Sequence, residues 1–168
     1  MKKIKVAVIG VGYLGEFHAD KYHANKSVDL IGVVDSDRKR RDAISKKLNI
    51  SSFSDYTKVL DDVDAVSISV PTDLHFKIGK FFIENGKHVL MEKPFTKNLS
   101  EAIKLENIAK KKGVVLQIGH IERFNKAYIK LEELVKNPLF IECNRISPIK
   151  VRGTEVDVIM DLMIHDLD

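Results

Sequence analysis

The stretch AVIGVGYLGEFHA, Ala7–Ala19, decides the fold, because three spaced glycines join an apolar strand-like run to a helical segment. Its centre, Gly10–Gly15, has the GxGxxG spacing, which is informative only when it follows a strand and opens a helix, as it does in this chain. There Gly10 would permit the tight turn, Gly12 would let the backbone approach a pyrophosphate, and Gly15 would let helix and strand pack closely. The alternative is an ordinary turn without a ligand. The context favours a dinucleotide site.

Residues around this loop extend the predicted dinucleotide site. Tyr13 and Leu14 lie where the loop enters the helix, whose N-terminal amides offer hydrogen-bond donors and a partial positive charge to a phosphate. The second predicted strand ends in GVVDSD, so Asp35 is placed to bind the adenosine ribose hydroxyls. That carboxylate would repel a 2′-phosphate and favours NAD over NADP. Arg38 and Lys39 weaken the preference, because a cation there could hold the phosphate instead.

Apolar runs alternate with helical segments through the first two-thirds of the chain. Continuous apolar strands that alternate with helices indicate a parallel sheet covered on both faces. We therefore predict an α/β fold, a Rossmann-type doubly wound parallel sheet, over residues 1–120. The predicted strands are Ile4–Ile9, Leu30–Val34, Ser51–Phe53 (a weaker one), Ala65–Val70, His88–Met91 and Val114–Ile118. The predicted helices are Leu14–Ala24, Asp37–Leu48, Asp73–Asn85 and Ser100–Lys112, with glycines at 86 and 113 as helix ends and Asn98 with Glu101 as a capping box.

The pattern changes after about residue 120. A helix is predicted from Ile121 to Lys136, then an extended segment from Leu139 to Ile149, then a helix that includes DLMIHDLD, Asp161–Asp168. We interpret residues 121–168 as the first elements of a truncated α+β substrate domain. In the last helix Asp161 and His165 are four apart and share one face. The remaining positions are so apolar that we expect this helix to be buried.

Composition excludes several classes of function. With 44% hydrophobic and 31% charged residues the chain has the make-up of an ordinary globular protein. The net charge of +4 comes from lysines interleaved with acids, which indicates solvated helix faces rather than nucleic-acid binding. The single Cys143 excludes an internal disulfide and fits a reducing compartment. Lys5 interrupts the apolar run after Met1, so we expect neither a signal peptide nor a membrane segment, and a cytoplasmic location.

Three further motifs carry a family resemblance: AVSISVPTDLHF at Ala65–Phe76, GKHVLMEKPFTKN at Gly86–Asn98, and DLMIHDLD at the end. In this order they resemble the Gfo/Idh/MocA family of nicotinamide-dependent sugar and cyclitol oxidoreductases. The resemblance covers essentially the whole chain, and its Glu-Lys-Pro element is much more specific than the glycine loop. It implies a second domain that continues beyond this chain, caps the substrate and often forms a dimer interface. A full-length form would then be a homo-oligomer.

The resemblance also implies the catalytic set. Lys93, Asp161 and His165 would take the hydroxyl proton and stabilise the developing alkoxide while hydride leaves for NAD. An unperturbed imidazole titrates at about pH 6.5 and suits a general base, so His165 is a better base than Lys93. Lys93 as an ammonium could donate a hydrogen bond to the substrate oxygen. Glu92 would position the loop, and Pro94 would follow a cis peptide bond. The alternative for Glu92-Lys93-Pro94 is a surface turn.

The remaining site residues follow strand ends, where α/β folds bind ligands. Pro71 and Thr72 would line the nicotinamide and ribose, and His75 would join them or have a structural role. His120, Arg123 and Asn125, in QIGHIERFNKAY, would face the substrate. This segment is similar to the UDP-N-acetylglucosamine 3-dehydrogenase subgroup, which implies a sugar or sugar-nucleotide substrate oxidised at a ring hydroxyl. Arg123 suits a phosphate or acidic group, although an ordinary ion pair explains it too.

Alternatives remain open from sequence. A non-catalytic NAD-binding module or sensor would share the glycine loop but show no substrate-dependent reduction. A methyltransferase-like cofactor site would leave Glu92-Lys93-Pro94 without a purpose. A metal site at Asp161 and His165 would need a third ligand from elsewhere, and we expect none. His18, His23 and His88 are interpreted as surface or packing residues.

Overall fold

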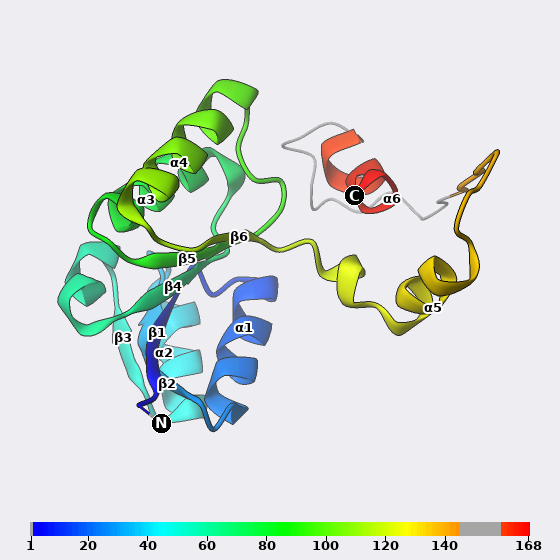
Figure 1. Cartoon of the computed structure of the whole chain (residues 1–168). Coiled ribbons are helices and arrows are strands. Elements are labelled where there is room, and N and C mark those ends of the chain that lie inside the picture. The colour runs from blue at the N-terminus through cyan, green and yellow to red at the C-terminus, as the bar shows by residue number, and fades with distance from the viewer. Residues whose placement is uncertain (1, 145–158) are drawn as a thin grey trace. The chain divides into compact units, whose positions relative to one another are not determined.

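The structure is a computed structural model that describes residues 2–144 and 159–168, apart from the side chain of Asp161. The chain divides into two compact units, Met1–Ile118 and Gly119–Asp168 (Figure 1).

The first unit is built on a sheet of six parallel strands in the order β3-β2-β1-β4-β5-β6. This is the strand order of the Rossmann fold and confirms the predicted fold class. The order reverses beside β1, which pairs with β2 on one side and with β4 on the other. The strands are β1 Ile4–Ile9, β2 Val28–Val34, β3 Ser51–Phe53, β4 Ala65–Ile68, β5 His88–Met91 and β6 Leu116–Ile118. The predicted fourth strand extends two residues too far, because Ser69 leaves the sheet and its hydroxyl donates to the Gly10 carbonyl.

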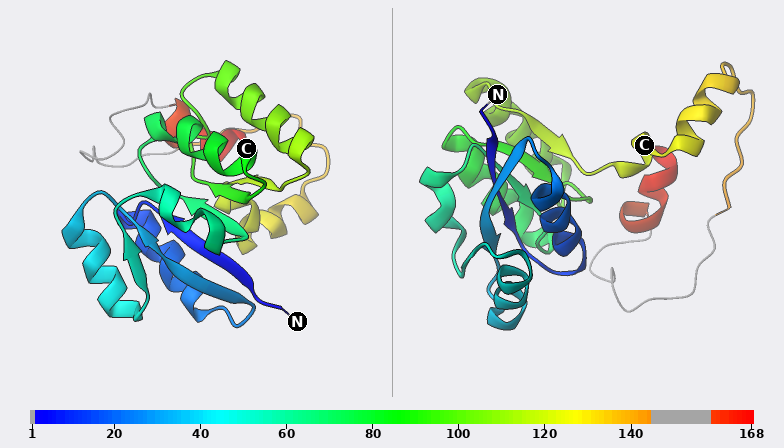
Figure 2. Two further views of the ribbon diagram at one scale, coloured as in Figure 1. Left: turned by 90° about the vertical axis from the view of Figure 1, so that its left-hand side faces the viewer. Right: turned by 90° about the horizontal axis from the view of Figure 1, so that it is seen from below.

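Helices cover both faces of this sheet (Figures 1 and 2). One face carries α1 Tyr13–Ala24 and α2 Arg38–Leu48, and the other carries α3 Thr72–Glu84 and α4 Leu99–Lys112. The predicted cap of α4 is present, since the Asn98 side chain accepts from the Glu101 N–H at 3.0 Å. A 3₁₀ helix at Tyr56–Asp62, η1, was not predicted. It is too short to show a helical period, although the Asp55 carboxylate caps it by accepting from the Thr57 N–H.

Two apolar cores result, one on each face of the sheet. Consecutive residues of β1 point to opposite faces: Ala7 and Ile9 join the core under η1, α3 and α4, while Val8 joins the core under α1 and α2. All three are buried. A strand buried on both faces explains why the sequence shows a continuous apolar run instead of an alternating one.

The second unit contains short helices: η2 Ile121–Phe124, α5 Lys126–Leu134, the π-helical turn η3 Ile159–Met163, and α6 Ile164–Leu167. The prediction of one helix from Ile121 to Lys136 was wrong. Asn125 divides it, because its side-chain oxygen accepts from the Ala127 N–H and starts a new helix. Residues 139–144 of the predicted extended segment form no regular structure, and the rest of that segment lies outside the described residues.

The expected burial of the last helix was also wrong for the described residues. No described side chain of α5 or α6 is buried, and Leu167 is 66% exposed. The described elements of this unit are short helices without a sheet to cover them. Asp157, predicted to extend the polar face of the last helix, lies outside the described residues.

Candidate functional site

The carboxyl ends of β1, β4 and β5 are level, because Ile9 pairs with Ile68 and Ile68 pairs with Met91. The loops that follow these strands therefore leave the same edge of the sheet. They contain Gly10–Gly12, Ser69–Thr72 and Glu92–Pro94 respectively. This edge beside the reversal of strand order is where open α/β sheets bind their ligands.

The three glycines of the first loop meet different surroundings. Gly10 has φ +85°, and a Cβ there would lie 2.7 Å from the Ser69 carbonyl oxygen. A Cβ on Gly15 would lie only 1.9 Å from the Gly10 carbonyl oxygen. A Cβ on Gly12 would meet nothing closer than the Arg40 guanidinium, at 3.9 Å. The fold itself therefore explains Gly10 and Gly15, whereas Gly12 keeps open a space beside the backbone.

That open space lies at the start of α1. Gly12 is the N-cap of this twelve-residue helix and makes no side-chain cap hydrogen bond. The N–H groups of a first helical turn point out of the helix and bind anions well. Tyr13 and Leu14 are the first two residues of that turn, with the Tyr13 side chain 62% exposed. The loop thus has the space and the donors that a pyrophosphate needs.

Asp35 connects the end of β2 to the glycine loop. One of its carboxylate oxygens accepts from the Val11 N–H at 2.9 Å, and the other accepts from the Asp37 N–H at 2.8 Å. The carboxylate is half-buried and fixed in place, and each oxygen keeps a lone pair for a ligand hydroxyl.

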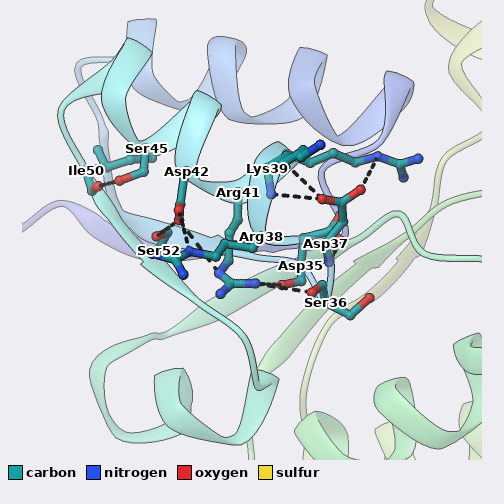
Figure 3. Close-up of polar contacts among 11 residues, drawn as sticks. Asp35, Ser36, Asp37, Arg38, Lys39, Arg41, Asp42, Ser45, Ile50 and Ser52 are labelled. Atoms are coloured by element: carbon teal, nitrogen blue, oxygen red, sulfur yellow. Dashed lines mark hydrogen bonds and ion pairs between the residues drawn. The ribbon is translucent and has the colours of Figure 1, made fainter.

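The arginines after Asp35 contact nearby acids, whereas Lys39 contributes its backbone N–H to the Asp37 carboxylate (Figure 3). Arg38 contacts Asp42 at 3.3 Å, and Arg40 contacts Asp37 at 3.4 Å. Arg41 donates to the carbonyl oxygens of Asp35 and Ser36, each at 3.2 Å. Exposed pairs of this kind are weak and exchange readily with solvent. The basic and acidic side chains therefore nearly balance in charge around the Asp35 carboxylate.

His75 joins the other two loops. Pro71 is the N-cap of α3 and Thr72 is its first residue, and the His75 ring, one turn further on, is only 1% exposed. Its Nε2 lies 2.9 Å from the Val70 carbonyl oxygen and its Nδ1 lies 3.0 Å from the Pro94 carbonyl oxygen. The loop after β4 is thereby tied to the loop after β5. Pro71, by contrast, is exposed at this edge.

The Glu-Lys-Pro loop is anchored by Glu92. The peptide bond between Lys93 and Pro94 is cis, as the family resemblance implied. Glu92 is 7% exposed; its Oε1 lies 2.9 Å from the Nε2 of His18, and its Oε2 accepts from the Lys93 N–H at 3.3 Å. Lys93 is half-buried. The motif is therefore a fixed, partly buried loop and not a loose surface turn.

Sequence reasoning missed the part played by His18, which we had interpreted as a surface or packing residue. The signal was its position: Gly15, His18, Ala19 and Tyr22 follow the i, i+3, i+4, i+7 pattern of one helix face. Gly15 and Ala19 are buried, so His18 faces the sheet. A histidine on that face must find partners, and it finds Ser67 and Glu92.

In the second unit, Arg123 and Asp168 form a bidentate ion pair, with nitrogen–oxygen distances of 2.7 and 2.6 Å. The hydrogen bond to Arg123 lowers the pKa of the Asp168 carboxyl, and the same bond raises the pKa of Arg123. His120 lies 3.6 Å from the same carboxylate. Asn125 caps α5 and donates to Glu122 at 2.9 Å. Four acidic and basic residues, His120, Glu122, Arg123 and Asp168, thus gather around η2.

The predicted catalytic set is divided between the two units. Lys93 belongs to the first unit, and His165 is half-buried on α6 in the second. The backbone of Asp161 lies in the π-helical turn, and its side chain is outside the described part of the chain. Among the described residues, no group of three or more His, Cys, Asp or Glu side chains could hold a metal ion. No helix among them is long and apolar enough to cross a membrane.

The fold and the glycine loop define a dinucleotide-binding protein of the Rossmann class. Residues 4–120 match the family model GFO_IDH_MocA, described as the oxidoreductase family with an NAD-binding Rossmann fold. The chain belongs to this family, which confirms the resemblance found in the sequence.

Individual relatives agree with this assignment. The chain is 42% identical over 169 residues to UDP-N-acetylglucosamine 3-dehydrogenase of Acidithiobacillus ferrooxidans, across 100% of this chain and 53% of that protein. The structure of that dehydrogenase, GnnA, superposes with a TM-score of 0.91 over 99% of this chain and 53% of that one. GenD2 from gentamicin A biosynthesis, solved in complex with NAD, is 29% identical with a TM-score of 0.77, over 80% of this chain and 39% of that one. The chain therefore spans about half the length of the relatives it matches most fully.

Proposed function

We propose that this chain carries the cofactor site and part of the catalytic site of an NAD-dependent dehydrogenase that oxidises a ring hydroxyl of a sugar or sugar nucleotide. The observation that supports it best is the sheet edge, where a glycine loop with an open position at Gly12 and the Glu92-Lys93-Pro94 loop leave the same edge of the sheet. The whole-chain similarity to a UDP-N-acetylglucosamine 3-dehydrogenase supports that sugar nucleotide, oxidised at C3, as the first substrate to test.

The cofactor residues in this proposal are those around the first loop. The amides at the start of α1 bind the pyrophosphate, with Gly12 giving the backbone access and Gly10, Tyr13, Leu14 and Gly15 shaping the turn. The Asp35 carboxylate accepts hydrogen bonds from the ribose hydroxyls.

The preference for NAD over NADP follows from charge. A 2′-phosphate would meet the Asp35 carboxylate, while Arg38 and Arg40 are already paired with Asp42 and Asp37. Releasing those cations for the phosphate is feasible because both pairs are exposed, so the preference is one of degree.

The proposed catalytic residues bind the substrate hydroxyl and take its proton. NAD, when bound, would supply the acceptor for the hydride of the carbinol carbon. Lys93 donates a hydrogen bond to the substrate oxygen, His165 takes the hydroxyl proton, and Asp161 orients the hydroxyl or the imidazole. Pro71 and Thr72 line the nicotinamide side, with His75 and Glu92 holding the two loops.

The substrate residues belong to the second unit, as the start of a substrate and dimerisation domain over residues 121–168. His120, Arg123 and Asn125 are its proposed contacts. Arg123 would exchange the Asp168 carboxylate for a substrate phosphate, which offers the same bidentate geometry. The longer protein would act as a homo-oligomer, with no nucleic-acid or membrane partner.

The first test is calorimetric titration of the 168-residue chain with NAD, NADH and NADP, beside a Gly12→Val variant. We expect a dissociation constant on the order of micromolar for NAD, weaker binding of NADP, and loss of binding in the variant. Gly12→Val should keep its circular dichroism spectrum, because a Cβ at this position meets no atom closer than the Arg40 guanidinium, at 3.9 Å. A folded chain that binds no NAD would contradict the proposal.

A second experiment separates the enzyme from a non-catalytic NAD-binding module. NADH formation is followed in the chain and in its longer form with UDP-N-acetylglucosamine, and compared with a Lys93→Met variant. Substrate-dependent NADH that disappears in the variant supports the dehydrogenase. NAD binding without turnover in either form supports the sensor.

A further inference from the structure

A chain of buried and half-buried polar groups crosses from α1 to the Glu-Lys-Pro loop. The Nδ1 of His18 lies 2.5 Å from the Ser67 hydroxyl on β4, and its Nε2 lies 2.9 Å from Oε1 of Glu92. Tyr22, one turn further along α1, shares a side-chain hydrogen bond with Ser67. Ser67 is fully buried and Glu92 is 7% exposed. Buried polar groups are costly unless they are satisfied, so these four depend on one another.

The order serine, histidine, carboxylate is that of a nucleophilic triad, but it cannot act as one in this fold. Ser67 lies within β4 at 0% exposure, where no substrate carbonyl can reach its hydroxyl. A nucleophile must be accessible and must face an oxyanion site. The cluster is therefore a means of holding side chains in place.

The acceptor character of a carboxylate sets the direction expected for the hydrogen bonds of His18. A carboxylate only accepts, so the Nε2 of His18 donates to Glu92 and carries the ring proton. The Nδ1 of a neutral ring then accepts from the Ser67 hydroxyl. Burial raises the pKa of Tyr22, partly offset by its hydrogen bond to Ser67. In this arrangement the protons of Ser67 and His18 both point toward Glu92.

Glu92 also contacts Lys93, because the Lys93 N–H donates to the second carboxylate oxygen of Glu92 at 3.3 Å. We propose that His18 is a positioning residue that fixes Glu92 and, through it, the backbone of Lys93. Helix α1, which begins at the glycine loop, is thereby locked to the loop that carries Lys93. The inference rests on the proposed function only in taking Lys93 as catalytic.

The test measures the free chain by NMR and needs neither NAD nor turnover. Ring ¹⁵N shifts of labelled histidine identify which nitrogen of His18 carries the proton, and amide hydrogen exchange reports on the Lys93 N–H. The variants are His18→Ala, His18→Gln and Glu92→Gln. The matched control is His23→Ala, which removes an exposed histidine from the same helix.

We expect a protonated Nε2 on His18 and a protected Lys93 amide in the parent chain. His18→Ala should raise exchange at Lys93 by about tenfold or more, the scale of a hydrogen bond to a charged group, while the amides of β1 stay protected. His18→Gln, which can donate to Glu92 through its amide, should restore part of the protection. His23→Ala should change neither readout.

Glu92→Gln gives an independent result if His18→Ala does not fold. A glutamine has one acceptor oxygen facing two donors, so either the proton of His18 moves to Nδ1 or the Lys93 amide loses its acceptor and exchanges faster. A wild-type ring protonated on Nδ1, or variants that loosen β1 and Lys93 equally, would overturn the proposal. Failure of NAD binding would refute the proposed function and leave these outcomes intact.

Discussion

At the scale of single residues, the three glycines of the loop have different neighbouring atoms. Gly15 is required by its own chain, because a Cβ would lie 1.9 Å from the Gly10 carbonyl oxygen, which is backbone and cannot move aside cheaply. Gly12 has no such neighbour. We expect Gly15→Ala to lower the free energy of unfolding by about 3 kcal/mol or more. Gly12→Ala, at an N-cap, should cost within about 1 kcal/mol. Urea denaturation of both variants measures this contrast, and equal losses would contradict it.

His75 is a second residue whose surroundings predict the effect of a substitution on stability. Its ring is buried and faces the carbonyl oxygens of Val70 and Pro94. A neutral imidazole donates through one nitrogen, so in His75→Leu one buried carbonyl loses its donor, and we expect a loss of about 1–3 kcal/mol in the free energy of unfolding. Guanidinium denaturation monitored by fluorescence checks this, with exposed His23→Leu as the control. A loss no greater than that of the control would mean that the two loops are held by other contacts.

At the scale of elements, Asp64 shows how a loop is fixed to a strand. Its side chain accepts from the Lys5 N–H at 2.9 Å, joining the turn before β4 to β1. That hydrogen bond, helped by Lys2, Lys5 and Lys87, lowers the pKa of Asp64 below the usual 3.8. A carboxyl whose pKa is lower in the folded state stabilises it above pH 3.8, and this contribution is lost as pH falls through the lowered value.

The pH dependence of unfolding tests that sign. We expect Asp64→Asn to lower the melting temperature at pH 7 and to reduce its decline between about pH 5 and 2. Asp61→Asn, which removes a nearby carboxylate that the described hydrogen bonds do not involve, serves as the control. Parallel melting curves for Asp64→Asn and the parent chain over this range would count against the role given to Asp64.

The helices and strands also differ in how well the sequence predicts them. The strands of the sheet followed from apolar runs, and the caps of α4 followed from the Asn98 side chain and from the positive φ that glycine allows at Gly113, because these signals are local. The break at Asn125 was missed because apolar residues with a helical period run through it. The Asn125 side chain caps a new helix there in spite of that periodicity. His18 was missed because its partners Ser67 and Glu92 lie 49 and 74 residues away in sequence. Contacts of that kind depend on strand order, which no local pattern gives.

At the scale of the whole chain, the two units differ in what holds them together. The buried apolar side chains of the described structure all belong to the first unit, from Val6 to Ala109. In the second unit Phe124, Leu134 and Leu139 are each at least 70% exposed. Resistance to local opening follows burial of apolar contacts, so the first unit should be much the more protected of the two.

Limited proteolysis measures this difference in resistance to local opening between the two units. We expect trypsin to cut first at lysines and arginines between residues 123 and 136, and to leave a resistant fragment that ends near residue 120. A chain of residues 1–120 should melt within a few degrees of the 168-residue chain, since the missing part supplies no buried apolar side chain among those described. Mass spectrometry of the fragments and thermal melts of both chains provide the measurements. First cuts within the sheet, or a large fall in the melting temperature of the shorter chain, would show that residues 121–168 stabilise the nucleotide-binding unit.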